Sequence, residues 1–307
     1  MKAAVFDGKK IKLKIVSDPK LEDSQVLVHV KAVGICGTDL AIVKRDLPTP
    51  TPIIPGHELV GEVLKLGKDV EQSWLNKRVT SEINSNIDFN CYYCKKGQYS
   101  QCISRKAIGI DIDGALAEYI ALESYLLHEI PDSISDDHAT FIEPLAAAYQ
   151  TFEMMPVGQN DKIMVIFGLG KLGLLITQVA LLKGLSLITI DGSNKKLNLA
   201  KKFGANHLIN RMNCKNIPNK IKELTNGLGG DIIVDTTGNP DALKDVIASC
   251  RTRGKIHIKS THGIETPINL TDVVVRELTL YSSRCGPFEK AIEGIKSGNI
   301  KVEELIS

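Results

Sequence analysis

The residues best suited to chemistry lie in four short pieces of this 307-residue chain. Three of these pieces are GICGTD (34–39), PGHELVGEV (55–63) and FIEPLAAAYQT (141–151). They offer a thiolate at Cys36, an imidazole at His57 and a carboxylate at Glu143. Zinc accepts these ligands at ~2.0–2.3 Å, and a catalytic site uses three protein ligands and keeps the fourth position open. A lone Cys, His or Glu is more often an ordinary core or surface residue, so the prediction depends on the three together.

The fourth piece, NIDFNCYYCKKGQYSQC (86–102), holds Cys91, Cys94 and Cys102, three of the seven cysteines in the chain. An odd number of cysteines without an export signal indicates a reducing compartment. There, clustered cysteines bind metal or act in catalysis more often than they form disulfides. A closed zinc site needs four ligands, so this spacing leaves one ligand to be found.

A dinucleotide-binding signal follows in GLGKLG (168–173), between an apolar run and a helical pattern. Gly168 would allow the tight turn after the strand, and Gly170 would let the backbone approach a pyrophosphate. Gly173 would let the helix pack closely on the strand. Lys171 and Leu172 complete the predicted loop at the helix N-terminus, whose free N–H groups would face the phosphates.

Asp191 ends the next predicted strand, 18 residues after Gly173. A carboxylate there can accept hydrogen bonds from the adenosine ribose hydroxyls and repels a 2′-phosphate, which favours NAD over NADP. Lys195 and Lys196 lie nearby and leave NADP as the alternative. The competing interpretation is that Asp191 only caps the following helix.

The predicted secondary structure that must position these residues differs between the two halves of the chain. The first ~140 residues predict strands at 25–35, 58–67 and 115–122, with an irregular, proline-rich loop at 46–56. After Pro144, apolar runs alternate with helical patterns and predict a parallel sheet with helices on both faces. The predicted strands of this second half are 162–167, 185–191, 231–235 and 254–260.

Together, these motifs resemble the zinc-dependent medium-chain dehydrogenases, the family of alcohol, polyol and glucose dehydrogenases. The resemblance runs from Met1 almost to the C-terminus. It implies an α/β protein with a mostly-β GroES-like catalytic domain over 1–145 and a doubly wound Rossmann domain over 146–283. Residues 284–307 would return to the catalytic domain and would be truncated relative to the family.

The resemblance also implies roles for the first set of residues. Cys36 and His57 would bind the catalytic zinc, and Glu143 would bind it directly or through water, as in the polyol-type branch. Glu58 would approach the zinc or stay beside it. Asp39 would orient the zinc-bound histidine and fix its tautomer.

The implied reaction is hydride transfer from an alcohol to a nicotinamide, with zinc as the Lewis acid that lowers the pKa of the hydroxyl. Thr38 matches the hydroxyl that relays the proton. Ala41 stands where some relatives have a relay histidine, so the further proton path is open. His262, in STHG, is either an exposed loop residue or a contact to substrate or cofactor.

The second zinc of the family lies in a lobe with four cysteines in the pattern C-x2-C-x2-C-x7-C. Cys91, Cys94 and Cys102 match the last three positions, and Asp88 occupies the first. An aspartate oxygen is an acceptable zinc ligand, so we predict a structural zinc held by one aspartate and three cysteines. The alternative is a lobe that has lost its metal.

The predicted function is therefore a zinc-dependent, NAD(P)-dependent oxidoreductase acting on a secondary alcohol, polyol or sugar. The alternatives are a zinc-free quinone or alkene reductase, against which the ligand set counts, and a non-catalytic NAD-binding protein. With 38 basic and 36 acidic side chains, the net charge of +2 predicts neither nucleic acid nor a membrane as partner. We expect a cytoplasmic homo-dimer or homo-tetramer, paired through a strand near 277–282.

Overall fold

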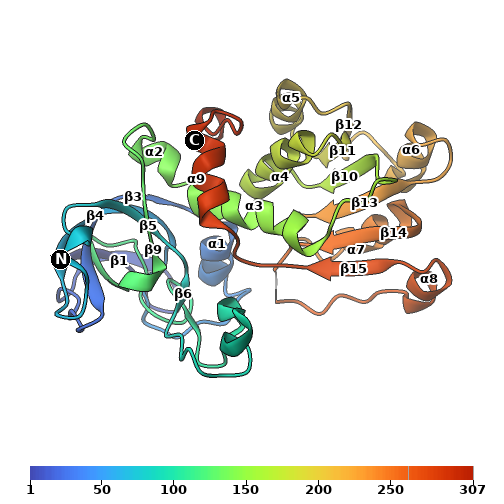
Figure 1. The fold of residues 1–307 in the computed structure, drawn as a ribbon. Coiled ribbons are helices and arrows are strands. Elements are labelled where there is room, and N and C mark those ends of the chain that lie inside the picture. Colours follow the sequence, from blue (N-terminus) through green and yellow to red (C-terminus); the bar gives the residue numbers. More distant parts are fainter. Residues whose placement is uncertain (262, 307) are drawn as a thin grey trace. The chain divides into compact units, whose positions relative to one another are not determined.

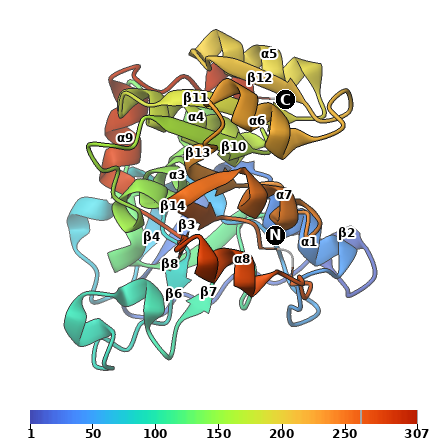
Figure 2. The same ribbon diagram turned by 90° about the vertical axis from the view of Figure 1, so that its right-hand side faces the viewer.

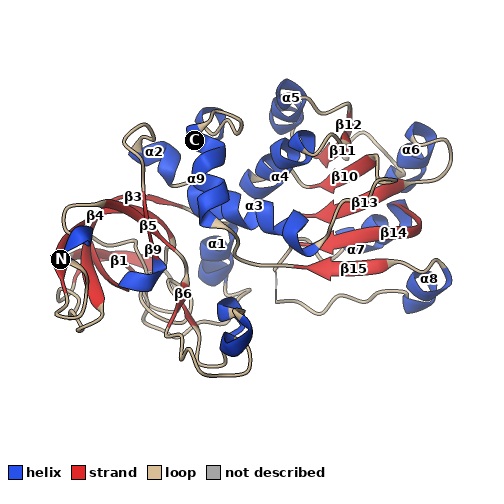
Figure 3. Cartoon of the chain, in the orientation of Figure 1, coloured by secondary structure: helices blue, strands red, loops and turns tan. Residues whose placement is uncertain are grey.

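The computed structural model describes residues 1–261 and 263–306, so His262 lies outside the described residues. The chain divides into two compact units, shown in Figures 1 and 3. Unit 1 comprises Met1–Glu143 and Phe288–Ile306, and unit 2 comprises Pro144–Pro287. That these units are functional domains divided at 145/146 and 283/284 stays a prediction.

Unit 1 is built mainly of antiparallel strands. Its strands are β1 Lys2–Phe6, β2 Ile11–Ile15, β3 Gln25–Gly34, β4 Glu58–Leu66, β5 Arg78–Ser81, β6 Asn84–Ser85, β7 Lys106–Ala107, β8 Tyr119–Glu123 and β9 Leu127–Glu129. Five of them form one sheet in the order β8-β3-β4-β5-β9, while β1 pairs with β2 and β6 with β7. The alternating residues Val26 and Val28 of β3 are fully buried in the core of this sheet, as the period of two requires.

The strand expected at 115–122 begins later than predicted. Only Tyr119–Glu123 forms the strand β8, while the preceding residues bond to the loop at Ile54–Gly56. Gly114, Ala115 and Leu116 donate backbone hydrogen bonds to the carbonyls of Ile54, Gly56 and Pro55. The next residues pair with β1 instead, where the Ala4 N–H donates to the Leu116 carbonyl and the Glu118 N–H donates to the Lys2 carbonyl.

The helices of unit 1 are few and short. They are α1 Gly37–Lys44, α2 Asp136–Ala139 and α9 Phe288–Lys296, with the 3-10 turns Gln72–Trp74, Cys94–Lys96, Tyr99–Gln101, Ser124–Leu126 and Glu303–Leu305. Helix α9 packs on β9, where the Phe288 ring stacks on His128 at 4.7 Å. Helix α3, Ile142–Met154, has its first two residues, Ile142 and Glu143, in unit 1 and continues in unit 2.

Unit 2 contains the parallel sheet that the alternating pattern predicted. Its strands are β10 Ile163–Phe167, β11 Ser186–Asp191, β12 His207–Asn210, β13 Gly230–Asp235, β14 Cys250–Ile258 and β15 Thr279–Ser282. They lie in the order β12-β11-β10-β13-β14-β15, with all neighbours parallel. This is the strand order of a doubly wound dinucleotide-binding fold, which places the switch point beside β10.

The helices of unit 2 are α4 Lys171–Leu182, α5 Asn194–Phe203, α6 Ile217–Leu224, α7 Ala242–Ser249 and α8 Leu270–Val275. Helices α4 and α5 contact each other, as do α6 and α7, and Figure 2 shows α5 lying beside β12. Right-handed crossovers place these two pairs on opposite faces of the sheet. None of the helices in the described residues combines the length and apolar character that a membrane span requires.

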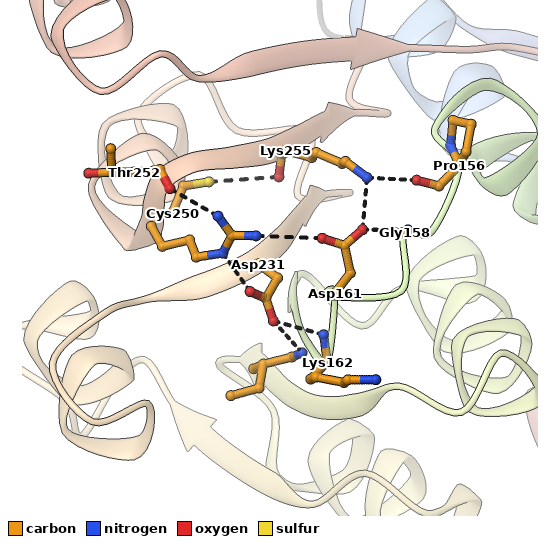
Figure 4. A network of polar contacts seen from close by, with 10 residues as sticks. Pro156, Gly158, Asp161, Lys162, Asp231, Cys250, Thr252 and Lys255 are labelled. Carbon is orange, nitrogen blue, oxygen red and sulfur yellow. Dashed lines mark hydrogen bonds and ion pairs between the residues drawn. The ribbon is translucent and has the colours of Figure 1, made fainter.

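A polar network ties together the ends of three strands in unit 2 (Figure 4). Lys255 Nζ lies 2.7 Å from Asp161 Oδ2 and also donates to the Pro156 carbonyl. Arg251 Nε lies 2.5 Å from Asp231 Oδ1, whose other oxygen accepts the backbone N–H groups of Lys162 and Ile163. The network holds the starts of β10, β13 and β14 in register.

Candidate active site

The first turn of α1 positions Cys36. Cys36 is the N-cap residue, and its backbone N–H donates to Asp39 Oδ2 at 2.8 Å. Asp39 Oδ1 accepts the backbone N–H of Gly56 at 3.1 Å. One buried carboxylate therefore fixes both the loop that carries Cys36 and the loop that carries His57.

His57 is buried and lies beside this carboxylate. Its Nδ1 is 3.8 Å from Asp39 Oδ1 and makes no hydrogen bond with any described residue. Burial opposes protonation of the ring, but interactions with Cys36, Glu143 and Asp39 outweigh it and raise the pKa of His57 to about 10. The site thus favours a positive charge at this position, which is what a bound cation would supply.

Two carboxylates approach this pair. The ligand atoms of Cys36, His57 and Glu58 all lie within 4.8 Å of one another. Glu143, in the first turn of α3, is also buried but is outside that set. Gly34 leaves room for Glu58, because a Cβ at residue 34 would lie 2.2 Å from Glu58 Oε2.

The donor set fits a zinc ion. Thiolate, imidazole and carboxylate are the usual zinc ligands, and ligand atoms around a tetrahedral zinc lie roughly 3.3–3.8 Å apart. The ligand atoms of Cys36, His57 and Glu58 lie within 4.8 Å of one another, which is close to that distance. The orientation of His57 agrees with this fit, because Nδ1 faces Asp39 and Nε2 remains for the metal.

Thr38 lies in the first turn of α1, between Cys36 and Asp39, and is half-buried. Ala41 follows on the same helix and offers no group that could move a proton. The helix thus brings the predicted relay hydroxyl close in sequence to the candidate ligand, and its role stays a prediction.

The second candidate metal site is the lobe at residues 88–102. The ligand atoms of Asp88, Cys91, Cys94 and Cys102 lie within 4.8 Å of one another, and the thiols of Cys91 and Cys94 are 3.5 Å apart. The turn after Cys94 ends at Gly97, whose φ of 70° is left-handed. All seven cysteines of the chain are free thiols.

Asp88 has its carboxylate held in place by the surrounding backbone. Its Oδ1 accepts the N–H groups of Asn90 and Cys91, both at 2.8 Å, and its Oδ2 accepts the Ser104 hydroxyl at 3.1 Å. The two N–H groups lower the pKa of Asp88 well below its usual range. The carboxylate is therefore charged and pre-oriented, as a metal ligand should be.

The thiols of the lobe crowd one another. Burial, together with the nearby Cys91, Cys102 and Asp88, raises the pKa of Cys94 to about 12. A divalent cation would remove this repulsion and favour the thiolates. The four groups thus fit a closed structural zinc site of one oxygen and three sulfur ligands.

The glycine loop of unit 2 has the geometry that a pyrophosphate requires. Gly168 has φ of 89°, and a Cβ at residue 173 would lie 2.1 Å from the Gly168 carbonyl oxygen. A Cβ at Gly170, the N-cap of α4, would meet no atom within 4 Å. Gly168 and Gly173 are therefore needed for the fold itself, whereas Gly170 keeps the space over the helix N-terminus open. Lys171 and Leu172 are half-buried in the first turn of α4.

Asp191 lies at the end of β11, beside the glycine loop. Its Oδ2 accepts the N–H of Leu169 at 2.8 Å, and its Oδ1 accepts the N–H of Ser193 at 2.9 Å. Lys196 Nζ is 3.8 Å from Oδ2. The carboxylate thus holds the loop and the start of α5, and it stands where the adenosine ribose would lie in this fold.

Sequence reasoning missed two neighbours of these sites. Gly34 makes room for Glu58, and Arg211 packs against Gly192, the residue after Asp191. Gly34 is the first residue of GICGTD but had no role assigned to it, and Arg211 belongs to no motif. Both contacts join segments that are about 20 residues apart in the sequence. The pairing of β11 with β12, which sets Asp191 opposite Asn210, is what brings Arg211 to the site.

Comparisons with known families match both halves of the chain. The model of the alcohol dehydrogenase GroES-like domain matches residues 22–132, and that of the zinc-binding dehydrogenase domain matches residues 172–297.

Individual proteins match over nearly the whole chain. Sorbitol dehydrogenase from Bacillus subtilis (strain 168) is 32% identical, over 100% of this chain and 89% of that protein. The structure of galactitol-1-phosphate dehydrogenase from Escherichia coli superposes with a TM-score of 0.89 at 26% identity, covering 99% of this chain and 91% of that one. A protein from Sinorhizobium meliloti 1021, described as a zinc-binding dehydrogenase and bound to NADP, gives a TM-score of 0.88 at 26% identity, with 98% and 90% covered.

Proposed function

Because the chain belongs to the zinc-dependent medium-chain dehydrogenase family, we propose that it oxidises a secondary hydroxyl of a polyol or sugar alcohol with a nicotinamide cofactor. The predicted family, the fold class and the oxidoreductase activity are confirmed by these matches. The polyol class is supported by the sorbitol and galactitol-1-phosphate dehydrogenases among the similar proteins.

The observation that carries the proposal is the convergence of Cys36, His57 and Glu58, of which His57 and Glu58 are buried and Cys36 is half-buried. Cys36 and His57 would hold the catalytic zinc, and Glu143 or Glu58 would supply the third ligand. When bound, zinc supplies a Lewis acid that makes a substrate hydroxyl acidic near neutral pH.

Other side chains of the protein would orient the zinc ligands, move the proton and bind the cofactor. Asp39 holds both ligand loops by its two backbone hydrogen bonds and orients His57. The Thr38 hydroxyl would take the proton from the substrate hydroxyl and pass it toward solvent. The glycine loop at 168–173 would bind the pyrophosphate, and Asp191 would bind the adenosine ribose.

The lobe would have a structural role. We propose that Asp88 and the three cysteines bind a second zinc that keeps residues 88–102 folded. A site with four protein ligands leaves no position for substrate, so this zinc would not take part in the reaction.

We also propose a cellular compartment and an oligomeric state for the protein. Seven free thiols support a reducing cytoplasm. Among the described residues, β15 is an edge strand of its sheet, which supports assembly into a homo-dimer or homo-tetramer through a second copy.

Elemental analysis of freshly purified protein tests the metal part of this proposal. We expect close to two zinc ions per chain, and one in a Cys102→Ser variant that still reduces NAD. A Cys36→Ser variant should also keep one zinc but lose activity, which makes it the matched control. Activity on sorbitol or galactitol in zinc-free protein would contradict the proposal and favour a zinc-independent reductase.

A further inference from the structure

We propose that Arg211 lets this protein bind NADP as well as NAD, by holding the 2′-phosphate next to Asp191. The inference rests on the proposed function, because it requires a dinucleotide at the glycine loop. It concerns the choice between two cofactors that differ only by one phosphate on the adenosine ribose.

The position of Arg211 follows from the pairing of two strands. Arg211 comes directly after β12, and its backbone N–H donates to the carbonyl of Asp191 at 3.1 Å. A Cβ placed on Gly192 would lie only 3.1 Å from Arg211 Nε. The guanidinium group therefore packs against the residue that follows Asp191, and it can do so because residue 192 has no side chain.

The guanidinium group is available for a ligand. Arg211 is exposed, and no carboxylate pairs with it within the part of the chain that the structure describes. A guanidinium presents a planar fork of N–H donors that matches the oxygens of a phosphate. The nearby Ser193 is the N-cap of α5, yet its hydroxyl makes no capping hydrogen bond.

Asp191 would repel a 2′-phosphate if its charge were uncompensated, but several groups compensate it. Its two oxygens accept backbone N–H groups at 2.8 and 2.9 Å, and Lys196 Nζ lies 3.8 Å away. The site therefore has two cationic side chains beside one carboxylate. Such a balance accepts either the ribose hydroxyl or a phosphate in its place.

The competing role for Arg211 is to stack on the adenine ring, since a guanidinium plane also packs on aromatic faces. Stacking would favour NAD and NADP equally, because both carry the same adenine. Phosphate binding would favour NADP alone. The two roles therefore differ in which affinity a substitution changes.

The test is calorimetric titration of the zinc-loaded full chain with NAD, NADP, 5′-AMP and 2′-AMP. We expect dissociation constants for NAD and NADP within about tenfold of each other in the unmodified protein. Arg211→Ala should weaken NADP and 2′-AMP by about tenfold or more and NAD and 5′-AMP by less than about twofold. Arg211→Lys should recover part of the NADP affinity, and Lys201→Ala, at the far end of α5, is the control for loss of one positive charge.

Three outcomes would overturn the inference. NADP binding more than about a hundredfold weaker than NAD in the unmodified protein would mean that Asp191 excludes the phosphate. Equal losses for NAD and NADP in Arg211→Ala would assign the residue to the adenine. Absence of binding by both cofactors would remove the proposed function and this inference with it, whereas the first two outcomes leave the proposed function intact.

Discussion

Removing Lys255 should destabilise unit 2 more than removing its partner Asp161 does. In a Lys255→Met variant, Asp161 would remain as a carboxylate that is 5% exposed, and the partners of its side chain among the described residues would be the Gly158 N–H at 2.7 Å and Arg251 at 3.7 Å (Figure 4). Leaving one partner of a buried ion pair uncompensated costs about 3–5 kcal/mol. Because two weaker partners remain, we expect the lower end, about 3 kcal/mol.

Asp161→Asn should cost less, because Lys255 is more exposed, at 24%, and keeps the Pro156 carbonyl as acceptor. We expect about 1 kcal/mol, the net contribution of one typical hydrogen bond, because the amide oxygen of the substituted side chain can still accept from Lys255. The double variant should be no less stable than Lys255→Met alone, because Asp161→Asn removes the uncompensated charge of the Asp161 carboxylate.

Urea and thermal unfolding followed by circular dichroism would measure these differences. A loss of about 3 kcal/mol corresponds to a fall in melting temperature of roughly 6–12 °C for a unit of this size. The fluorescence of Trp74, the single tryptophan, reports on unit 1 and should change little. Lys220→Met is the matched control, because its partner Glu223 is 64% exposed, and the melting temperature should not change measurably.

Strict additivity of the two single substitutions would refute the reasoning. So would a Lys255→Met variant as stable as the unmodified protein. Either result would mean that solvent reaches Asp161 easily, so that its carboxylate does not depend on Lys255.

Three further predictions concern the two sites and the sheet. Gly170→Ala should leave the melting temperature unchanged but weaken NAD binding, measured by calorimetry, by about tenfold or more, which corresponds to about 1.4 kcal/mol per tenfold. Gly173→Ala should instead lower the melting temperature, because its Cβ would lie 2.1 Å from the Gly168 carbonyl oxygen. Asp39→Ala should weaken zinc binding by about 10–100-fold in a chelator competition, because the loops that carry Cys36 and His57 each lose a hydrogen bond. An unchanged zinc affinity would show that these loops keep their conformation without Asp39. Burial and then Lys259 lower the pKa of His257 to about 4, so the unfolded chain binds the proton first as the pH falls from 6.5 toward 4. Stability should therefore drop by up to about 3 kcal/mol over that range, and His257→Gln should remove this part of the pH dependence in urea titrations.

The sequence by itself determined the local motifs. Gly168, Gly170 and Gly173 could be assigned because a tight turn and a close approach each demand glycine at a fixed spacing. The alternation of apolar runs with helical patterns likewise specified the parallel sheet of unit 2. The four ligand candidates of the lobe lie within one 15-residue segment. The spacing of the three cysteines predicted a metal site, and the resemblance to the family pattern added Asp88 as the fourth ligand.

Only the tertiary structure decided which distant residues share a site. Glu58, rather than Glu143, lies within 4.8 Å of both Cys36 and His57, because β4 runs beside β3 and Gly34 leaves space for the carboxylate. Arg211 reaches Gly192 only through the register of β12 on β11. Register depends on packing against the rest of the sheet, and a shift by one residue would move every side chain to the other face. A single sequence encodes that choice in contacts that are spread over the whole unit, so no local pattern reveals it.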